Sequence, residues 1–233
     1  MRKKEHLSVE DLFNKIAINY DLLNDILSLG LHRIWKRKVL QSVAPSYGER
    51  WLDLCCGTGD MSFALAHIVG LEGSVFGIDF ADEILAVAKK RHLQAPDLPI
   101  SWLNLDVLNT GLASNSFDGV VMAYGLRNVE DFLKALSEIH RLLKPGGKAA
   151  ILDFNHMKEG SVGASFQNFY LRNIVVNIAA LFHAKREYDY IQKSIKRFPS
   201  GLELKVLANQ AGFIDSTFQV MCAGQMGLLF LQA

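Results

Sequence analysis

WLDLCCGTGD, residues 51–60, is an apolar segment that runs directly into a glycine turn. Gly57 and Gly59 lack the Cβ atoms that would keep a ligand away from the backbone N–H groups of the turn. A carboxylate, Asp79, follows Gly57 at about the spacing that places an acidic side chain on the hydroxyls of a ribose. This combination predicts a site for a nucleotide-type cofactor, and therefore an enzyme.

Short apolar segments alternate with helical patterns through the middle of the chain. The predicted strands are residues 50–54, 74–78, 100–105, 117–123 and 148–154, and the predicted helices are residues 59–69, 82–92 and 129–143. This alternation predicts an α/β fold, a mostly parallel sheet with helices on both faces. A helix at 202–211 and strands at 213–221 and 226–231 complete the pattern. The last two strands are close enough to form a hairpin, so one strand of the seven should run antiparallel.

Both ends of the chain are expected to add helices to one single domain. Helical spacing of apolar residues predicts helices at 9–18, 20–29 and 32–43, which would form an N-terminal lid over residues 1–45. Residues 46–155 would form the cofactor-binding half, and residues 156–233 the substrate-side helices and the hairpin. The aromatic segment 166–190 has two interpretations: core and lid packing, or the wall of a tunnel for a long apolar tail.

Composition excludes several classes of protein. The net charge of +1 argues against a general nucleic-acid binder. Residues 1–40 and 183–205 each carry an excess of three basic side chains, either as solvated helix faces or as basic flaps near an anionic surface such as a membrane. No apolar run is long enough to cross a bilayer. The three cysteines have no partners at ligand spacing, so neither a disulfide framework nor a metal site is expected.

More polar residues follow the predicted strands at their carboxyl ends, where ligands bind in open α/β sheets. Asp53 could hold the turn amides or the ammonium group of a ligand, and Thr58 adds a hydroxyl. Asp106 and Val107 follow the third strand and could grip an adenine by one polar and one apolar contact.

The turn matches a pyrophosphate site poorly. The third glycine position of a Gly-x-Gly-x-x-Gly turn is occupied by Ser62, and Asp60 in the first helical turn is expected to repel a pyrophosphate. A cofactor without phosphates fits better, which favours S-adenosylmethionine over NAD.

Longer motifs resemble one known family. LDLxxGTGD (52–60), GID (77–79) and LKPGG (143–147) look like a class I methyltransferase. FNxIAxxYDxLNDxLSxGxHRxWK (13–36) and YGLRNV (124–129) closely resemble the ubiquinone/menaquinone-biosynthesis C-methyltransferases, which methylate a ring carbon of a prenylated quinol. The chain departs from the pattern at Cys55, where the general turn has glycine, and at Ala123, where bacterial relatives carry a hydroxyl.

The resemblance implies a site as well as a fold. S-adenosylmethionine would contact Thr58, Asp79, Asp106 and Val107, and the residues above add Asp53, Gly57 and Gly59 to the candidate cofactor site. The quinol carbon becomes nucleophilic when its neighbouring hydroxyl loses a proton, and a cation beside that oxygen lowers its pKa. Candidates for these roles are Arg127 as the cation, Asn128 to orient the oxygen, and Tyr20, His32 and Asp153 as proton acceptors. Lys36 or Arg33 could meet the cofactor carboxylate or lipid phosphates, or be ordinary exposed residues.

The expected substrate is a naphthoquinol, as in menaquinone or phylloquinone synthesis, because the chain resembles the cyanobacterial and plastid branch overall. The alternatives are a benzoquinol of the ubiquinone pathway, a soluble small-molecule acceptor, and an inactive cofactor-binding scaffold. Peripheral membrane contact and a homodimer are further expectations. The expected location is the bacterial cytoplasm at the membrane surface, or the plastid if a transit peptide has been removed.

Overall fold

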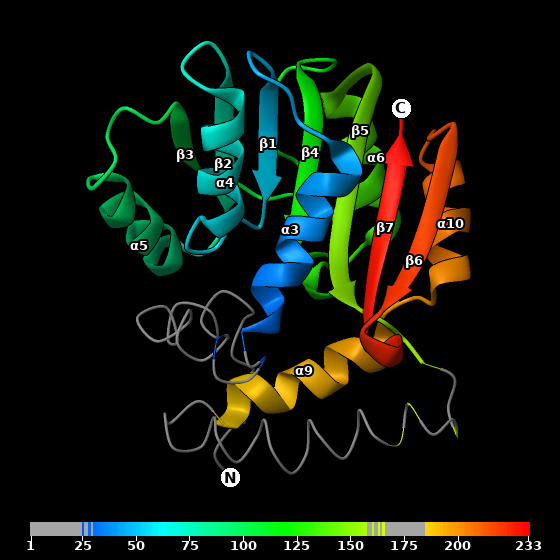
Figure 1. The fold of residues 1–233 in the computed structure, drawn as a ribbon. Coiled ribbons are helices and arrows are strands. Elements are labelled where there is room, and N and C mark those ends of the chain that lie inside the picture. Colours follow the sequence, from blue (N-terminus) through cyan, green and yellow to red (C-terminus); the bar gives the residue numbers. More distant parts are fainter. Residues whose placement is uncertain are drawn as a thin grey trace, which may run out of the picture.

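A seven-stranded sheet forms the centre of the molecule (Figure 1). The computed structural model describes residues 25, 28, 30–157, 160, 163, 165 and 185–233. In the sheet order β3-β2-β1-β4-β5-β7-β6, strand β7 runs antiparallel to both of its neighbours and the other neighbouring pairs are parallel. The predicted fold with one antiparallel strand is confirmed. The strands are β1 (Arg50–Leu54), β2 (Ser74–Asp79), β3 (Ile100–Asn104), β4 (Phe117–Ala123), β5 (Leu143–Phe154), β6 (Asp215–Met221) and β7 (Met226–Gln232).

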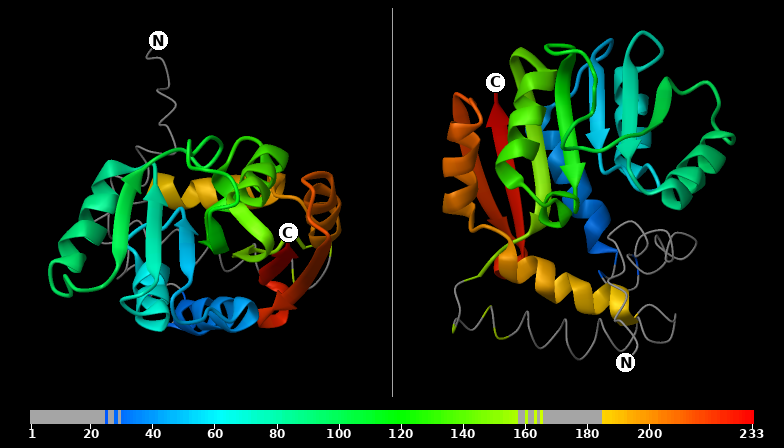
Figure 2. Two further views of the ribbon diagram at one scale, coloured as in Figure 1. Left: turned by 90° about the horizontal axis from the view of Figure 1, so that it is seen from above. Right: turned by 180° about the vertical axis from the view of Figure 1, so that it is seen from behind.

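Helices cover both faces of this sheet, as Figure 2 shows from above. Helices α3 and α4 lie on one face and α6 and α10 on the other, while α5 lies at the β3 edge. Helix α9 passes below the carboxyl ends of the parallel strands (Figure 1). The helices are α3 (Leu31–Val43), α4 (Asp60–Val69), α5 (Asp82–His92), α6 (Phe132–Leu142), α9 (Lys185–Arg197) and α10 (Gly201–Gln210), with 3₁₀ turns η2 (Leu126–Asn128) and η4 (Cys222–Gly224).

The core has two layers because successive strand residues point to opposite faces of the sheet. Trp51 packs in the layer that contains Val39 of α3 and Leu65 of α4. Leu52 packs in the other layer, with Leu136 of α6. Burial on both faces explains why these strands are continuous apolar runs in the sequence.

Most element boundaries agree with the sequence-based prediction, and two differ by several residues. The helix predicted from Val129 begins only at Phe132, because the Asp131 side chain caps it by accepting a hydrogen bond from the Lys134 amide at 2.9 Å. Strand β5 begins at Leu143 rather than 148, because Leu143 pairs with Phe117 of β4. Such pairing depends on the neighbouring strand and leaves no local signal.

The helices predicted at residues 9–18 and 20–29 lie outside the described residues. The same holds for most of the aromatic segment 166–190, of which only residues 185–190 are described. The lid and the aromatic tunnel therefore stay predictions. Helix α3, predicted at 32–43, is present and packs against the sheet. None of the helices within the described ranges is long and apolar enough to span a membrane.

Candidate active site

The turn between β1 and α4 has an unusual backbone. Cys55, Gly57 and Gly59 all have positive φ angles, of 55°, 56° and 89°. The left-handed region costs a residue with a Cβ about 1–2 kcal/mol, so Cys55 stands where glycine would be less strained. Strain of this kind persists where the surrounding structure over-determines it, often at ligand sites.

Asp79, at the end of β2, holds this turn in place. Its Oδ2 accepts a hydrogen bond from the Gly57 amide at 2.9 Å, and its Oδ1 accepts one from the Ala81 amide at 3.0 Å. Burial raises the pKa of Asp79, and the hydrogen bonds from Ala81 and Gly57 oppose that rise. Each carboxylate oxygen has two lone pairs, so both retain room to accept a ribose hydroxyl. The predicted contact of Asp79 with a ribose fits this geometry.

Asp53 lies beneath the turn and is only 1% exposed. Its Oδ2 accepts a hydrogen bond from the Ser62 hydroxyl at 2.6 Å, so it holds the first turn of α4. Burial raises the pKa of Asp53 to about 7, although Ser62 and Lys36 favour the charged form. A cationic group bound nearby would stabilise the carboxylate, which fits the ammonium contact suggested from the sequence.

We expect Asp53→Asn to change how stability depends on pH. The folded pKa lies above the ordinary value of 3.8, so the stabilising contribution of Asp53 is present at low pH and is lost as the pH rises from about 4 to about 7. Between pH 5 and pH 8 the wild type should lose about 2–3 kcal/mol relative to the variant. Urea unfolding at a series of pH values measures the free energy of unfolding of both proteins. A difference between wild type and variant that stays the same from pH 5 to pH 8 would contradict the prediction.

The remaining predicted cofactor residues lie at the same edge of the sheet. Thr58 and Val107 are buried, and Asp106 is exposed. The Asp106 Oδ1 accepts a hydrogen bond from the Leu108 amide at 2.9 Å, which shapes the loop after β3. Val107 packs into the core layer of Leu52. One polar and one apolar contact are therefore available side by side.

Gly59 has a packing role that the sequence did not indicate. A Cβ atom on Gly59 would lie 2.4 Å from Cη2 of Trp102, and the Gly59 amide already donates to the Cys56 carbonyl at 2.9 Å. Its missing side chain therefore makes room for Trp102 of β3. That it also lets a ligand approach the turn stays a prediction.

Gly59→Ala should destabilise the protein by about 2–5 kcal/mol, since backbone strain and overpacking add. The matched control is Gly48→Ala, where φ is +81° but no atom lies within 4 Å of the added Cβ. Gly48→Ala introduces backbone strain without a clash, so it should lower the free energy of unfolding by about 1–2 kcal/mol. Thermal unfolding of both variants checks the difference, and equal losses would mean that the clash with Trp102 is relieved at little cost.

Arg127 of η2 is buried in an ion pair. Its Nη1 lies 2.9 Å from Asp153 Oδ1 and also donates to the Tyr124 carbonyl at 2.7 Å. The Arg127 amide donates to Asp153 Oδ2 at 3.0 Å, and the Phe154 amide donates to Asp153 Oδ1 at 2.8 Å. Asp153 is the next-to-last residue of β5, the strand beside β4. Its hydrogen bonds fit a positioning role for Arg127 better than that of a proton acceptor.

Two polar atoms beside this pair lack partners within the part of the chain that the structure describes. They are Nε of Arg127, a donor, and Oδ1 of Asn128, an acceptor, and both are buried. The amide nitrogen of Asn128 donates to the Tyr124 carbonyl at 3.0 Å, which fixes its orientation. Buried polar atoms normally have a partner. A donor and an acceptor on consecutive residues, both without partners among the described residues, fit an exchangeable hydroxyl of a bound molecule.

Cys55 connects the cofactor turn with the Arg127 turn. A Cβ atom on Gly125 would lie 2.6 Å from the Cβ of Cys55, so the two turns are in direct contact. Burial raises the pKa of the Cys55 thiol, and the carboxylates of Asp79, Asp53 and Asp153 raise it further. The structure thus places the turn that carries Arg127 and Asn128 directly beside the predicted cofactor turn. Within the described residues, no cluster of three metal-binding side chains occurs.

Of the other two predicted proton acceptors, Tyr20 lies outside the described residues and His32 is buried in α3. The Nδ1 of His32 lies 2.7 Å from the Ser28 hydroxyl, and its Nε2 lies 3.7 Å from Asp25 Oδ1. Burial lowers the pKa of His32, and Lys36 lowers it further, while Asp25 opposes them. The imidazole is therefore neutral at physiological pH, as a proton acceptor must be.

Two basic residues of α3 are already paired. Arg33 Nε donates to Asp25 at 2.9 Å, and Lys36 Nζ donates to Asp60 at 2.9 Å. Arg91 also pairs with Asp60, at 2.9 Å. Two cations thus partner the Asp60 carboxylate, and its expected repulsion of a pyrophosphate stays a prediction. The sequence offered no signal for Arg91.

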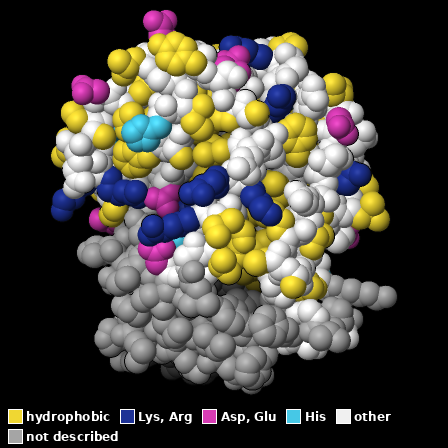
Figure 3. All heavy atoms as spheres, viewed as in Figure 1, with side chains coloured by type: hydrophobic (Ala, Val, Ile, Leu, Met, Phe, Trp, Pro, Cys, Tyr) yellow, Lys and Arg dark blue, Asp and Glu magenta, His cyan; other side chains and the backbone are white. Residues whose placement is uncertain are grey.

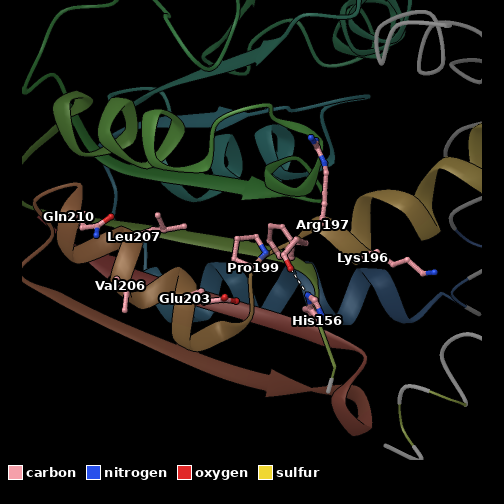
Figure 4. A pocket seen from close by; sticks show the side chains of 9 residues that line it. His156, Lys196, Arg197, Pro199, Glu203, Val206, Leu207 and Gln210 are labelled. Carbon is pink, nitrogen blue, oxygen red and sulfur yellow. Dashed lines mark hydrogen bonds between the residues drawn. The ribbon is translucent and has the colours of Figure 1, made fainter. Parts of the chain in front are cut away.

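A separate hollow of about 550 Å³ lies between α9 and α10 (Figure 4). His156 Nδ1 lies 2.5 Å from the Phe198 carbonyl at its wall. Arg197, also on the wall, donates to the carbonyls of Arg127 and Val129 at 3.1 and 2.8 Å. The C-terminal end of α9 is thereby tied to η2, the turn that carries Arg127.

The sequence of this chain is similar to known proteins over most of its length. A family model described as the ubiE/COQ5 methyltransferase family matches residues 1–230. The 2-phytyl-1,4-naphtoquinone methyltransferase of Nostoc punctiforme is 47% identical over 95% of this chain and 96% of its own. The chloroplastic 2-phytyl-1,4-beta-naphthoquinone methyltransferase of Arabidopsis thaliana is 43% identical over 94% of this chain and 84% of its own.

Solved structures share the fold at low sequence identity. A putative S-adenosyl-L-methionine-dependent methyltransferase of Methanococcus maripaludis has a TM-score of 0.63 at 20% identity, over 99% of this chain and 96% of its own. A Haemonchus contortus phosphoethanolamine N-methyltransferase in complex with S-adenosylhomocysteine has a TM-score of 0.71 at 19% identity, over 97% of this chain and 60% of its own.

Proposed function

The chain belongs to the ubiE/COQ5 methyltransferase family, and from this premise we propose that it methylates a ring carbon of a prenylated naphthoquinol with S-adenosylmethionine as the donor. The product would be a phylloquinol or a menaquinol. The naphthoquinol is favoured over a benzoquinol because the similar relatives named above act, by name, on a phytyl naphthoquinone.

The proposal depends most on two buried polar atoms that lack hydrogen-bond partners among the described residues and belong to the turn that contacts the cofactor turn. Nε of Arg127 and Oδ1 of Asn128 are a donor and an acceptor without partners among the described residues. A quinol hydroxyl can accept from the first and donate to the second. A cofactor-binding scaffold would have no use for such an arrangement.

The residues of the glycine turn fit S-adenosylmethionine. Asp79 would hold the ribose hydroxyls, Asp106 and Val107 the adenine, and Asp53 the ammonium group. The bound cofactor supplies a methyl group on a positively charged sulfur, which a carbon nucleophile can displace. The buried carboxylates Asp53 and Asp79 would favour a cationic ligand at this place.

The protein's own contribution is to make the ring carbon nucleophilic. The guanidinium of Arg127 favours the phenolate over the phenol, because an adjacent cation lowers the pKa of a hydroxyl. Asp153 keeps that guanidinium in place through the Nη1 contact at 2.9 Å, which leaves Nε for the substrate. Asn128 turns the hydroxyl so that the carbon beside it faces the cofactor.

His32 is proposed to accept the proton, directly or through water, with Tyr20 as a second candidate. The neutral imidazole has the required protonation state. The buried surroundings of Arg127 exclude water, which strengthens its interaction with a developing phenolate.

A prenylated substrate resides in a membrane, so we also propose contact with a membrane surface through the basic segments 1–40 and 183–205. The plant relative is named as chloroplastic. We propose a location at the membrane surface of a bacterial cell or within a plastid.

The test is methyl transfer from labelled S-adenosylmethionine to demethylmenaquinol, demethylphylloquinol and a demethylated ubiquinol precursor, each kept reduced. We expect label in the two naphthoquinols alone. Label in the benzoquinol alone would move the proposal to the ubiquinone pathway. Equal turnover of tail-free substrates would indicate a soluble acceptor, and cofactor binding without transfer would indicate a scaffold.

A further inference from the structure

A cluster of three charged residues joins the cofactor turn to helices on either side. Asp60, the first residue of α4, accepts hydrogen bonds from Lys36 Nζ of α3 and from Arg91 Nη1 of α5, both at 2.9 Å. The same nitrogen of Arg91 donates to the Thr58 carbonyl at 2.8 Å. One carboxylate therefore connects three helices, and one guanidinium nitrogen reaches the centre of the turn.

The cluster is partly shielded from water. The side chains of Lys36, Asp60 and Arg91 are 16%, 29% and 36% exposed. Burial alone would raise the pKa of Asp60, but Lys36 and Arg91 lower it to about 2. The guanidinium of Arg91 also lies 5.1 Å from the ring centroid of Phe63 in α4. Figure 3 shows basic and acidic side chains gathered on this face, beside α3.

The fold does not depend on this cluster. Helices α3 and α4 are already attached to the sheet by Val39, Val43 and Leu65, all fully buried or nearly so. Partly exposed ion pairs add little to stability. What the three residues add is a definite position of the turn relative to α3, which carries His32 one helical turn before Lys36.

We propose that Lys36, Asp60 and Arg91 are positioning residues for methyl transfer. Arg91 and Asp60 keep the turn in its cofactor-binding shape through the Thr58 carbonyl, and Lys36 sets the place of α3 and His32 relative to that turn. This inference rests on the proposed function, and it concerns residues that touch neither the methyl group nor the quinol.

The experiment compares Arg91→Met, Asp60→Asn and Lys36→Met for binding of S-adenosylhomocysteine, by calorimetry, and for steady-state kinetics. Arg91→Met and Asp60→Asn should each weaken binding and raise KM for the donor about tenfold, which corresponds to loss of one charge-assisted contact. Lys36→Met should leave binding within about twofold and lower kcat about tenfold, because small misplacements of catalytic groups cost rate. Lys36→Arg should restore kcat.

The matched control is Lys144→Met. Lys144 Nζ pairs with Asp118 at 2.6 Å, but at the amino-terminal end of β5, away from the cofactor turn. This variant should change neither binding nor kcat. Unchanged binding in Arg91→Met and Asp60→Asn, with only a lowered melting temperature, would overturn the proposal, as would an unchanged kcat in Lys36→Met. If the wild type methylates no quinol, the proposed function fails, and the binding series still decides whether Arg91 and Asp60 position the turn.

Discussion

Arg127→Met is expected to lower kcat about 10³-fold, because it removes the one group that would stabilise the developing phenolate in a buried site. The variant leaves the Asp153 carboxylate, 2% exposed, without its cationic partner. Breaking a buried pair in this way costs about 3–5 kcal/mol of stability. Transfer rates with saturating cofactor and quinol, together with urea unfolding, measure both effects.

A double variant separates catalysis from folding. Arg127→Met combined with Asp153→Asn removes the uncompensated charge. The asparagine oxygen still accepts from one backbone amide, while its NH₂ group faces the other amide, donor against donor. We expect part of the stability to return and the activity to stay lost. Recovery of kcat to within about tenfold of the wild type in this stable double variant would rule out the electrostatic role of Arg127.

Asp79→Asn is expected to raise the Kd for S-adenosylhomocysteine about 100-fold, since it removes a charged acceptor worth about 2–3 kcal/mol. The two oxygens of Asp79 accept from the Gly57 and Ala81 amides. The asparagine NH₂ group would face one of these amides, donor against donor, and distort the turn as well. Calorimetric titration gives the Kd directly.

The control for this change is Asp118→Asn, which alters an acid at the amino-terminal end of β4 that also accepts a backbone amide, from Arg50 at 2.9 Å. Its Kd should match that of the wild type. A comparable loss of affinity in both variants would mean that Asp79 acts through general stability and not through the cofactor.

Much of the candidate site could be predicted before the fold was known. Asp79 and Asp106 each follow a predicted strand, Asp53 lies near the end of another, and parallel strands bring their carboxyl ends to one edge. Arg127 and Asn128 came from the resemblance of YGLRNV to a family motif. The Asp153 contact could not be assigned in the same way, because it requires that β5 lie directly beside β4.

The sequence by itself determined the alternation of strands and helices, the glycine turn and the acids at the strand ends, because backbone periodicity and glycine conformations are local properties. Only the tertiary structure decided which charges meet. It pairs Arg127 with Asp153, and Asp60 with both Lys36 and Arg91. It also turns Gly59 toward Trp102. These contacts join residues far apart in the chain, and their strength depends on burial, which close packing of the whole fold creates.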